Sequence, residues 1–286
     1  MNTQVDTFAG LIGQINVKKL LEGALESGKL AQTMIFAGPK GVGRKTAALL
    51  LAKVLHGDDQ KTHPDTFIFS DILAEMREHD KGIKDAADEV IRFLQLSPIA
   101  SKFKVAIIDE CETLSLAAQN ALLKTLEEPR EDTTLILIAE DEKRLLPTIV
   151  SRSQVVRFGP LKDEDIERRV PNVSAEILQA AQGSLGFALE MTESPEKWET
   201  LEKMQDFWSS VETRDTEDKF KWAEEMKARE DALGFLRVGA RVLRDRLVQD
   251  PNVQTSVQLT QLQEVIYQVQ DNVNARAAIE VLLLVL

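Results

Sequence analysis

A glycine-rich segment at positions 38–46 carries the residue types that most directly suggest chemistry. Gly38 and Gly43 have the spacing of a phosphate-binding loop, in which glycines let backbone N–H groups turn inward around phosphate oxygens and the following helix adds its dipole. A strand-like apolar run at 33–37 precedes the segment and a helical pattern follows it, as such a loop requires. The segment therefore predicts a nucleotide-binding site that includes Gly38, Gly41 and Gly43.

Two positions depart from the usual pattern of this loop, which reads Gly, four residues, Gly, Lys and then Ser or Thr. Arg44 stands at the lysine position and Lys45 at the Ser/Thr position. In the normal register, Arg44 is a bulky substitute for a compact ammonium, and Lys45 cannot ligate Mg²⁺ because an ammonium has no lone pair. In a shifted register, one residue is inserted and Lys45 and Thr46 act as the working pair. A third interpretation is a strand-to-helix turn that binds nothing.

A second candidate site follows the apolar run at 105–108, which ends in Asp109 and Glu110. A buried strand with this ending can deliver one carboxylate near a metal ion and a second that orients a water molecule. After a strand-anchored phosphate loop, the pattern predicts a Walker B element; the alternative is a polar strand end that caps the next helix. Cys111 is predicted to be a small packing residue, because no histidine lies near it in the sequence.

These candidates require a sheet that brings their loops to one edge. Short runs of apolar and β-branched residues bounded by polar positions indicate strands that are buried on both faces. They lie at 33–37, 66–69, 105–108, 134–139 and 155–158. Helical patterns separate several of them, at 46–55, 85–96 and 116–128. This alternation predicts an α/β fold with a parallel sheet and crossover helices.

The composition excludes several classes of protein. With 286 residues, 43% hydrophobic and 29% charged, the chain can bury a core, which excludes wholesale disorder. Its net charge of -12 argues against a whole surface that grips DNA or an anionic membrane. A single cysteine excludes an internal disulfide and a cysteine-rich zinc site. We find no signal-peptide pattern and no apolar run of spanning length, so we expect a soluble cytoplasmic protein without a membrane partner.

Three longer motifs resemble the clamp-loader ATPases of the AAA+ class. The segments are KVAIIDE at 104–110, AQNALLKTLEEP at 118–129 and LLPTIVSRS at 145–153. Within that family, Gly-Val-Gly-Arg in the phosphate loop and the ending at 272–280 resemble the delta-prime type of bacterial DNA polymerase III more than the motor type. The resemblance extends over essentially the whole chain and is strongest at 101–159.

The resemblance implies an AAA+ core with a parallel sheet over 1–160, a small helical lid over 161–194 and an all-helical collar for oligomerisation over 195–286. It also implies a hetero-oligomeric ring with motor ATPase subunits and a clamp-opening subunit. Such a ring opens the sliding clamp and places it on primer–template DNA. Arg152 would be an arginine finger, which reaches a neighbour's nucleotide and stabilises charge on the transferring phosphoryl group. The alternative is an ordinary surface arginine.

Further departures from the family pattern concern the sensors and the metal. Ala139 and Glu140 stand where a polar sensor of the terminal phosphate is expected, and Gly186 stands where the lid usually has an arginine. The four-cysteine zinc module of many relatives is missing, so we expect no metal site, and we expect His56 and His63 to be loop or capping residues.

Together these departures predict a stator, a subunit that assists ATP hydrolysis without performing it. It would require no cofactor and would at most bind ATP or ADP with Mg²⁺ weakly. Two alternatives stay open at this point. One is an active clamp-loader motor subunit that uses Lys45 and Thr46 in a shifted loop, and the other is a small-molecule P-loop enzyme such as a kinase.

Overall fold

The structure is a computed structural model that describes residues 7–57, 63–69, 83–226, 228–270 and 273–286. The chain divides into two compact units, Met1–Thr192 and Glu193–Leu286. The further division at residue 160 that the family resemblance implies stays a prediction. No helix within the described ranges has the length and apolar content that a membrane span requires.

The first unit contains a parallel sheet whose order is β2-β3-β4-β1-β5. Its five strands are β1 (Thr33–Ala37), β2 (Thr66–Ile68), β3 (Lys104–Ile108), β4 (Thr133–Ala139) and β5 (Gln154–Arg157). The strand β1 lies between β4 and β5 and pairs with both, so that Ile35 lies opposite Leu137 and Val155. The predicted parallel α/β sheet is therefore confirmed.

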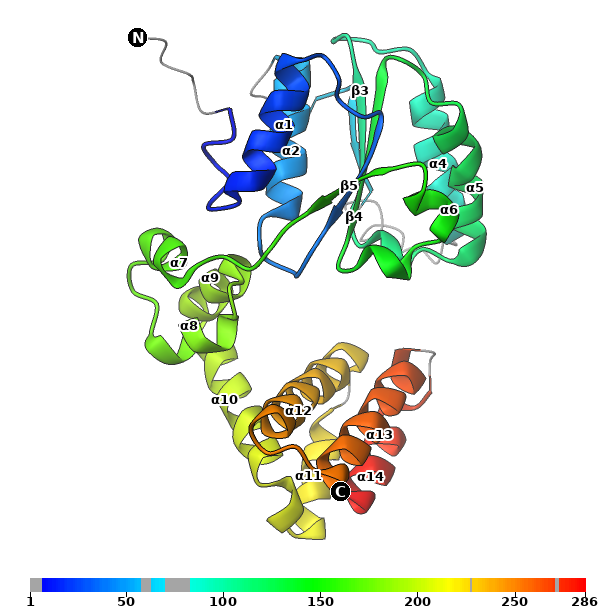
Figure 1. Cartoon of the computed structure of the whole chain (residues 1–286). Coiled ribbons are helices and arrows are strands. Elements are labelled where there is room, and N and C mark those ends of the chain that lie inside the picture. Colours follow the sequence, from blue (N-terminus) through cyan, green and yellow to red (C-terminus); the bar gives the residue numbers. More distant parts are fainter. Residues whose placement is uncertain (1–6, 58–62, 70–82, 227, 271–272) are drawn as a thin grey trace. The chain divides into compact units, whose positions relative to one another are not determined.

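Helices cover both faces of this sheet (Figure 1). On one side lie α1 (Ile15–Glu26) and α2 (Arg44–His56); on the other lie α4 (Ile83–Gln95), α5 (Leu116–Glu127) and α6 (Pro147–Val150). Alternate residues of each strand serve the two cores. Met34 and Phe36 pack with α1 and α2, whereas Ile35 and Ala37 pack with α4 and α5. Burial on both faces explains why the strands read as continuous apolar runs.

A buried aspartate organises the segment that leads into β3. The Asp65 carboxylate accepts hydrogen bonds from the backbone N–H groups of Ile99, Ala100 and Ser101, at 2.8, 2.7 and 2.9 Å. Burial acts to raise the pKa of Asp65, but the three backbone donors outweigh it and hold the pKa below the usual value of 3.8. The charged form of Asp65 therefore stabilises the fold.

Replacing Asp65 with asparagine should destabilise the first unit by about 2 kcal/mol at pH 7, because buried N–H donors lose a charged acceptor. The folded pKa of Asp65 lies below the unfolded one. Its stabilisation is therefore complete above about pH 4 and is lost as the pH falls through the folded pKa. Urea unfolding followed by circular dichroism at several pH values checks both points. The exposed Glu131→Gln is the control, and an equal loss of stability at pH 7 and at low pH would contradict this role of the Asp65 charge.

The two histidines of this region have local structural contacts. The His56 ring lies 2.8 Å from Ser101 Oγ and 2.7 Å from Thr66 Oγ1, so it joins α2 to β2 and to the segment before β3. The His63 ring stacks on His56 with centroids 3.9 Å apart, and its Nδ1 accepts the backbone N–H of Asp65. Both side chains thus tie loops to the sheet.

Three short helices, α7 (Asp163–Arg169), α8 (Ala175–Ala181) and α9 (Leu185–Glu193), follow the sheet in the sequence. The second unit is helical throughout its described residues, as its composition predicts. Its α-helices are α10 (Pro195–Ser209), α11 (Thr216–Glu225), α12 (Arg229–Gln249), α13 (Val253–Gln270) and α14 (Ala275–Val285). They enclose an aromatic cluster around the fully buried Trp208, whose indole Nε1 donates to the Phe235 carbonyl at 2.9 Å. Gly239 of α12 lies against the Trp208 ring.

Candidate functional site

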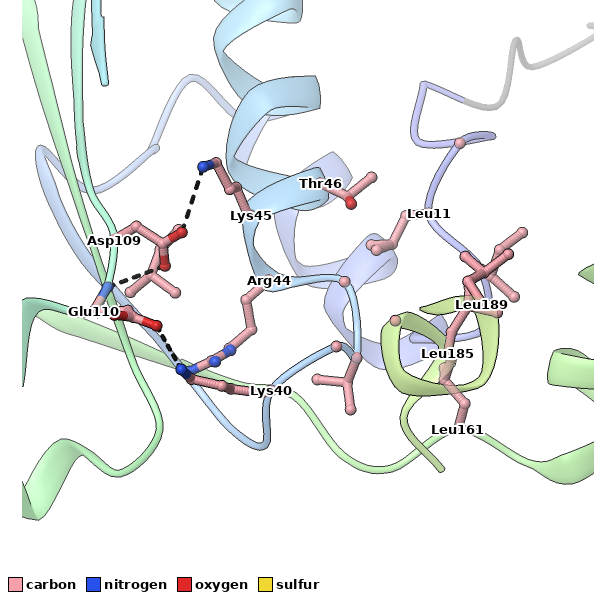
Figure 2. Close-up of a pocket in the computed structure, with 17 residues that line it drawn as sticks. Leu11, Lys40, Arg44, Lys45, Thr46, Asp109, Glu110, Leu161, Leu185 and Leu189 are labelled. Carbon is pink, nitrogen blue, oxygen red and sulfur yellow. Dashed lines mark hydrogen bonds and ion pairs between the residues drawn. The ribbon is translucent and has the colours of Figure 1, made fainter. Parts of the chain in front are cut away.

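A pocket of about 340 Å³ opens where β1 and β3 end, between the phosphate loop and α9. Figure 2 shows charged side chains on one side of it and leucines on the other. The sequence-predicted residues that line it are Gly41, Gly43, Arg44, Lys45, Thr46, Asp109 and Glu110. Gly38 belongs to the same loop but is not a lining residue. The structure therefore brings together the loop and the acidic end of β3, which the sequence treats as separate motifs.

The loop has a backbone shape that only glycine suits. Gly41 and Gly43 have φ of 76° and 100°, in the left-handed region that side chains disfavour. A Cβ atom at Gly41 would lie 2.2 Å from Ser184 Oγ, and one at Gly43 would lie 2.7 Å from Leu11 Cδ1. Gly43 is the N-cap of α2, so the positive end of that helix dipole lies at the pocket.

The two carboxylates at the end of β3 have ammonium partners within the chain. Lys45 Nζ lies 3.6 Å from Asp109 Oδ2, and Lys40 Nζ lies 2.5 Å from Glu110 Oε1 (Figure 2). Lys40 also lies 4.0 Å from Glu140. Lys45 could be identified from the loop pattern but Lys40 could not, because nothing in the local sequence pairs a loop lysine with a glutamate that follows another strand.

These contacts do not fit a Mg²⁺ ion. The cation needs oxygen ligands, yet the loop offers a lysine at the position where a hydroxyl would serve, and that ammonium lies beside Asp109. Thr46, the hydroxyl of the shifted register, points away from Asp109 (Figure 2). Within the described residues, no group of three His, Cys, Asp or Glu side chains could hold a metal ion.

Arg44 is buried at the base of this site. Its side chain lines the pocket and runs toward Glu110 and Lys40 (Figure 2), and the residue is only 7% exposed. Its Nη1 atom is buried and has no hydrogen-bond partner among the described residues. A buried guanidinium N–H without an acceptor costs folding free energy. This group is therefore suited to donate a hydrogen bond to an anionic oxygen.

Cys111 lies in the core that α4 and α5 share with the sheet, as predicted for a packing residue. Burial raises the pKa of its thiol above the usual range, and the neighbouring Glu112 acts in the same direction. A buried thiol with a raised pKa is a weak nucleophile, which agrees with a packing role for Cys111.

The helix α9 touches the phosphate loop through backbone atoms. The Gly186 N–H donates to the Gly41 carbonyl at 2.9 Å, and a Cβ atom at Gly186 would lie 2.9 Å from Gly41 Cα. No side chain fits at position 186 without moving the helix, so the contact with Gly41 requires glycine at this position. The leucines on this side of the pocket, which the sequence analysis also missed, are Leu11, Leu161, Leu185 and Leu189.

Arg152 lies outside the pocket, just after α6. Its Nη2 is 2.8 Å from Glu127 Oε1 at the end of α5, and its Nη1 donates to the Thr148 carbonyl at 3.1 Å. The Arg152 side chain is 36% exposed and that of Glu127 is 52% exposed. The guanidinium is therefore held at the surface of the first unit by a residue to which the sequence analysis gave no role.

A parallel sheet with a phosphate loop after β1, an acidic ending on β3, which β4 separates from β1, and helices that follow the sheet define an AAA+ type fold. The sequence profile of the family described as "DNA polymerase III, delta subunit" matches residues 13–162. The chain therefore belongs to this family, among the clamp-loader subunits of bacterial DNA polymerase III.

Two curated relatives agree with this assignment. The delta' subunit of Bacillus subtilis DNA polymerase III is 32% identical over 213 residues, which cover 67% of this chain and 63% of the relative. The tau subunit of the same organism is 34% identical over 189 residues, or 62% of this chain. The matches span about a third of the length of the tau subunits, 34% in B. subtilis and 32% in Escherichia coli.

Among the solved structures that share the fold is one from another bacterium. It is a DNA polymerase III gamma subunit-related protein from Thermotoga maritima, with a TM-score of 0.57 over 93% of this chain and 97% of that one. At 18% sequence identity, this likeness concerns the fold alone.

Proposed function

We propose that this chain is a delta-prime type subunit of a cytoplasmic clamp loader and acts as its stator. It joins motor ATPase subunits and a clamp-opening subunit in a ring that places the sliding clamp on primed DNA. It hydrolyses no ATP itself and donates Arg152 to the nucleotide site of a neighbour. The observation that carries the proposal is the pairing inside its own pocket, where Lys45 lies beside Asp109 and Lys40 beside Glu110.

The pocket lacks the groups that phosphoryl transfer needs. Hydrolysis depends on a metal ion that bridges the phosphates and on a residue that orients the attacking water. Lys45 replaces the hydroxyl ligand of the metal, and Lys40 engages the Glu110 carboxylate that would orient the water. The strand β4 ends in Ala139, which offers no polar side chain to the terminal phosphate. These losses are independent of one another and all favour a catalytically silent subunit.

The place of Arg152 supports a role in trans. The residue does not line its own pocket, and more than a third of its side chain is exposed. Glu127 holds the guanidinium in a defined position, so less conformational entropy is lost when it meets the phosphates of a neighbour. A guanidinium so placed can stabilise the charge that builds on the transferring phosphoryl group.

The motor-subunit alternative has less support. It requires Thr46 to act with Lys45, but Thr46 points away from Asp109 (Figure 2). The kinase alternative gives no role to the helical second unit, Glu193–Leu286, and the family match argues against it.

The purified protein should release no phosphate from Mg²⁺-ATP above background. Mixed with the motor and clamp-opening subunits of the same organism, it should complete a loader that places the clamp on primed DNA. Size-exclusion chromatography and a clamp-loading assay measure the two properties. The motor alternative would be established if the protein alone hydrolysed ATP, and if this activity were lost in Lys45→Ala but kept in Arg44→Ala. A fully active loader assembled without this chain would refute the stator role.

A further inference from the structure

We propose that the Lys45 ammonium takes the place of the divalent cation, and that the pocket binds the phosphates of an adenine nucleotide without Mg²⁺. The inference rests on the proposed function because it concerns the ligand of a pocket that does not hydrolyse. It does not depend on Arg152, so the two proposals can fail separately.

The first support is the position of the ammonium. In a working phosphate-loop site, the metal is held by the loop Ser/Thr and by the acidic residue at the end of the Walker B strand. Lys45 occupies that Ser/Thr position, and its Nζ lies 3.6 Å from Asp109 Oδ2. An ammonium cannot ligate a metal, and its charge repels a dication at this distance from the carboxylate. The site thus already contains a cation where the metal would bind.

The second support is the charge of the pocket. Among its lining residues, Lys40, Arg44 and Lys45 are cationic and Asp109 and Glu110 are anionic. The pocket therefore has a net positive charge without any metal. An ordinary site with one loop lysine and two carboxylates lacks this surplus and needs Mg²⁺ to balance the phosphates.

The third support is a buried hydrogen-bond donor of Arg44 that lacks an acceptor among the described residues. Arg44 is only 7% exposed, lines the pocket, and has a buried Nη1 without a hydrogen-bond partner among the described residues. A phosphate oxygen would give this guanidinium a charge-assisted hydrogen bond. The N-terminus of α2 lies at the same pocket, so its backbone N–H groups and dipole add to the attraction.

The opposite wall favours a nucleotide over a bare anion. Leu11, Leu161, Leu185 and Leu189 make this side of the pocket apolar (Figure 2). Its volume of about 340 Å³ lies in the range of small-molecule sites. A purine base can pack against these leucines while its phosphates reach the charged side.

Isothermal titration of the full-length protein with ADP, in excess Mg²⁺ and in EDTA, tests the proposal. The dissociation constant should differ by less than about twofold between the two buffers, whereas a Mg²⁺-dependent site should lose at least about tenfold, or about 1.4 kcal/mol, in EDTA. ADP should bind at least about tenfold more tightly than inorganic pyrophosphate. Binding that EDTA weakens tenfold, no binding of ADP in either buffer, or equal affinity for pyrophosphate would each overturn the proposal.

The variant Lys45→Thr gives a more discriminating test, because it restores a hydroxyl at the loop position that ordinarily ligates the metal. This variant should bind ADP with Mg²⁺ but at least about tenfold more weakly in EDTA. Lys19→Thr, which changes an exposed lysine on α1, is the matched control and should behave as the wild type. Circular dichroism of each variant shows that it is folded. Metal-independent ADP binding by folded Lys45→Thr would show that the ammonium does not replace the metal.

Discussion

Replacing Arg152 with alanine should slow ATP hydrolysis about 10³-fold or more at the one site that receives this guanidinium in the assembled loader. The charge that develops on the phosphoryl group would lose its trans partner, while the nucleotide and metal of the neighbour stay in place. Single-turnover hydrolysis by the complete loader is the suitable measurement, because steady-state rates average over all sites. A slow phase should appear that is absent from the wild-type loader.

Arg157→Ala provides the matched control. Arg157 is also a surface arginine of the first unit that pairs with a glutamate, with Nη2 2.7 Å from Glu142 Oε1 and a side chain 71% exposed. Its loss should leave hydrolysis unchanged. Glu127→Gln removes the ion pair of Arg152 but keeps the guanidinium, so we expect a smaller loss than for Arg152→Ala. Unchanged single-turnover kinetics in an intact Arg152→Ala loader would remove the arginine-finger proposal.

Replacing Gly239 with alanine should destabilise the second unit by about 3 kcal/mol. The new Cβ atom would lie 2.4, 2.5 and 2.6 Å from three atoms of the Trp208 indole. Trp208 is fully buried and its indole N–H is held by the Phe235 carbonyl, so the ring cannot swing aside without breaking that bond and the aromatic packing. Either the ring or α12 must move.

Gly234→Ala is the control, because it changes the same residue type in the same helix. A Cβ atom there would meet nothing within 4 Å, so alanine should stabilise α12 by about 0.5–1 kcal/mol through its higher helix propensity. The chain has three tryptophans, Trp198, Trp208 and Trp222, all in Glu193–Leu286, so tryptophan fluorescence during denaturant unfolding reports this unit alone. Equal stability of the two variants would show that the indole contact does not constrain the helix.

The sheet could be predicted from the sequence because each strand is buried on both faces and therefore reads as an uninterrupted apolar run. The ends of elements were harder to predict. The helix α2 begins at Arg44 rather than at 46, because the left-handed Gly43 caps it within the loop. The strand β2 ends at Ile68 although Phe69 is equally apolar and fully buried. In both cases the backbone geometry decides where the element begins or ends, and this boundary cannot be inferred from the residue types.

The loop and the acidic strand end could be identified from the sequence because each is a local pattern with a known chemical use. The pairing of Lys40 with Glu110 and of Arg152 with Glu127 could not, because these contacts depend on how separate strands and helices come together. Gly186 shows the same limit. In the sequence this glycine is only a departure from a family pattern, whereas in the structure its close approach to Gly41 leaves no room for a side chain.

That close approach has a consequence for the subunit at work. The hydrogen bond from the Gly186 N–H to the Gly41 carbonyl holds α9 against the loop through protein atoms alone. We therefore expect the orientation of α9 relative to the phosphate loop to stay the same at high and at low cellular ratios of ATP to ADP. Such a part can serve as a fixed reference against which moving neighbours swing.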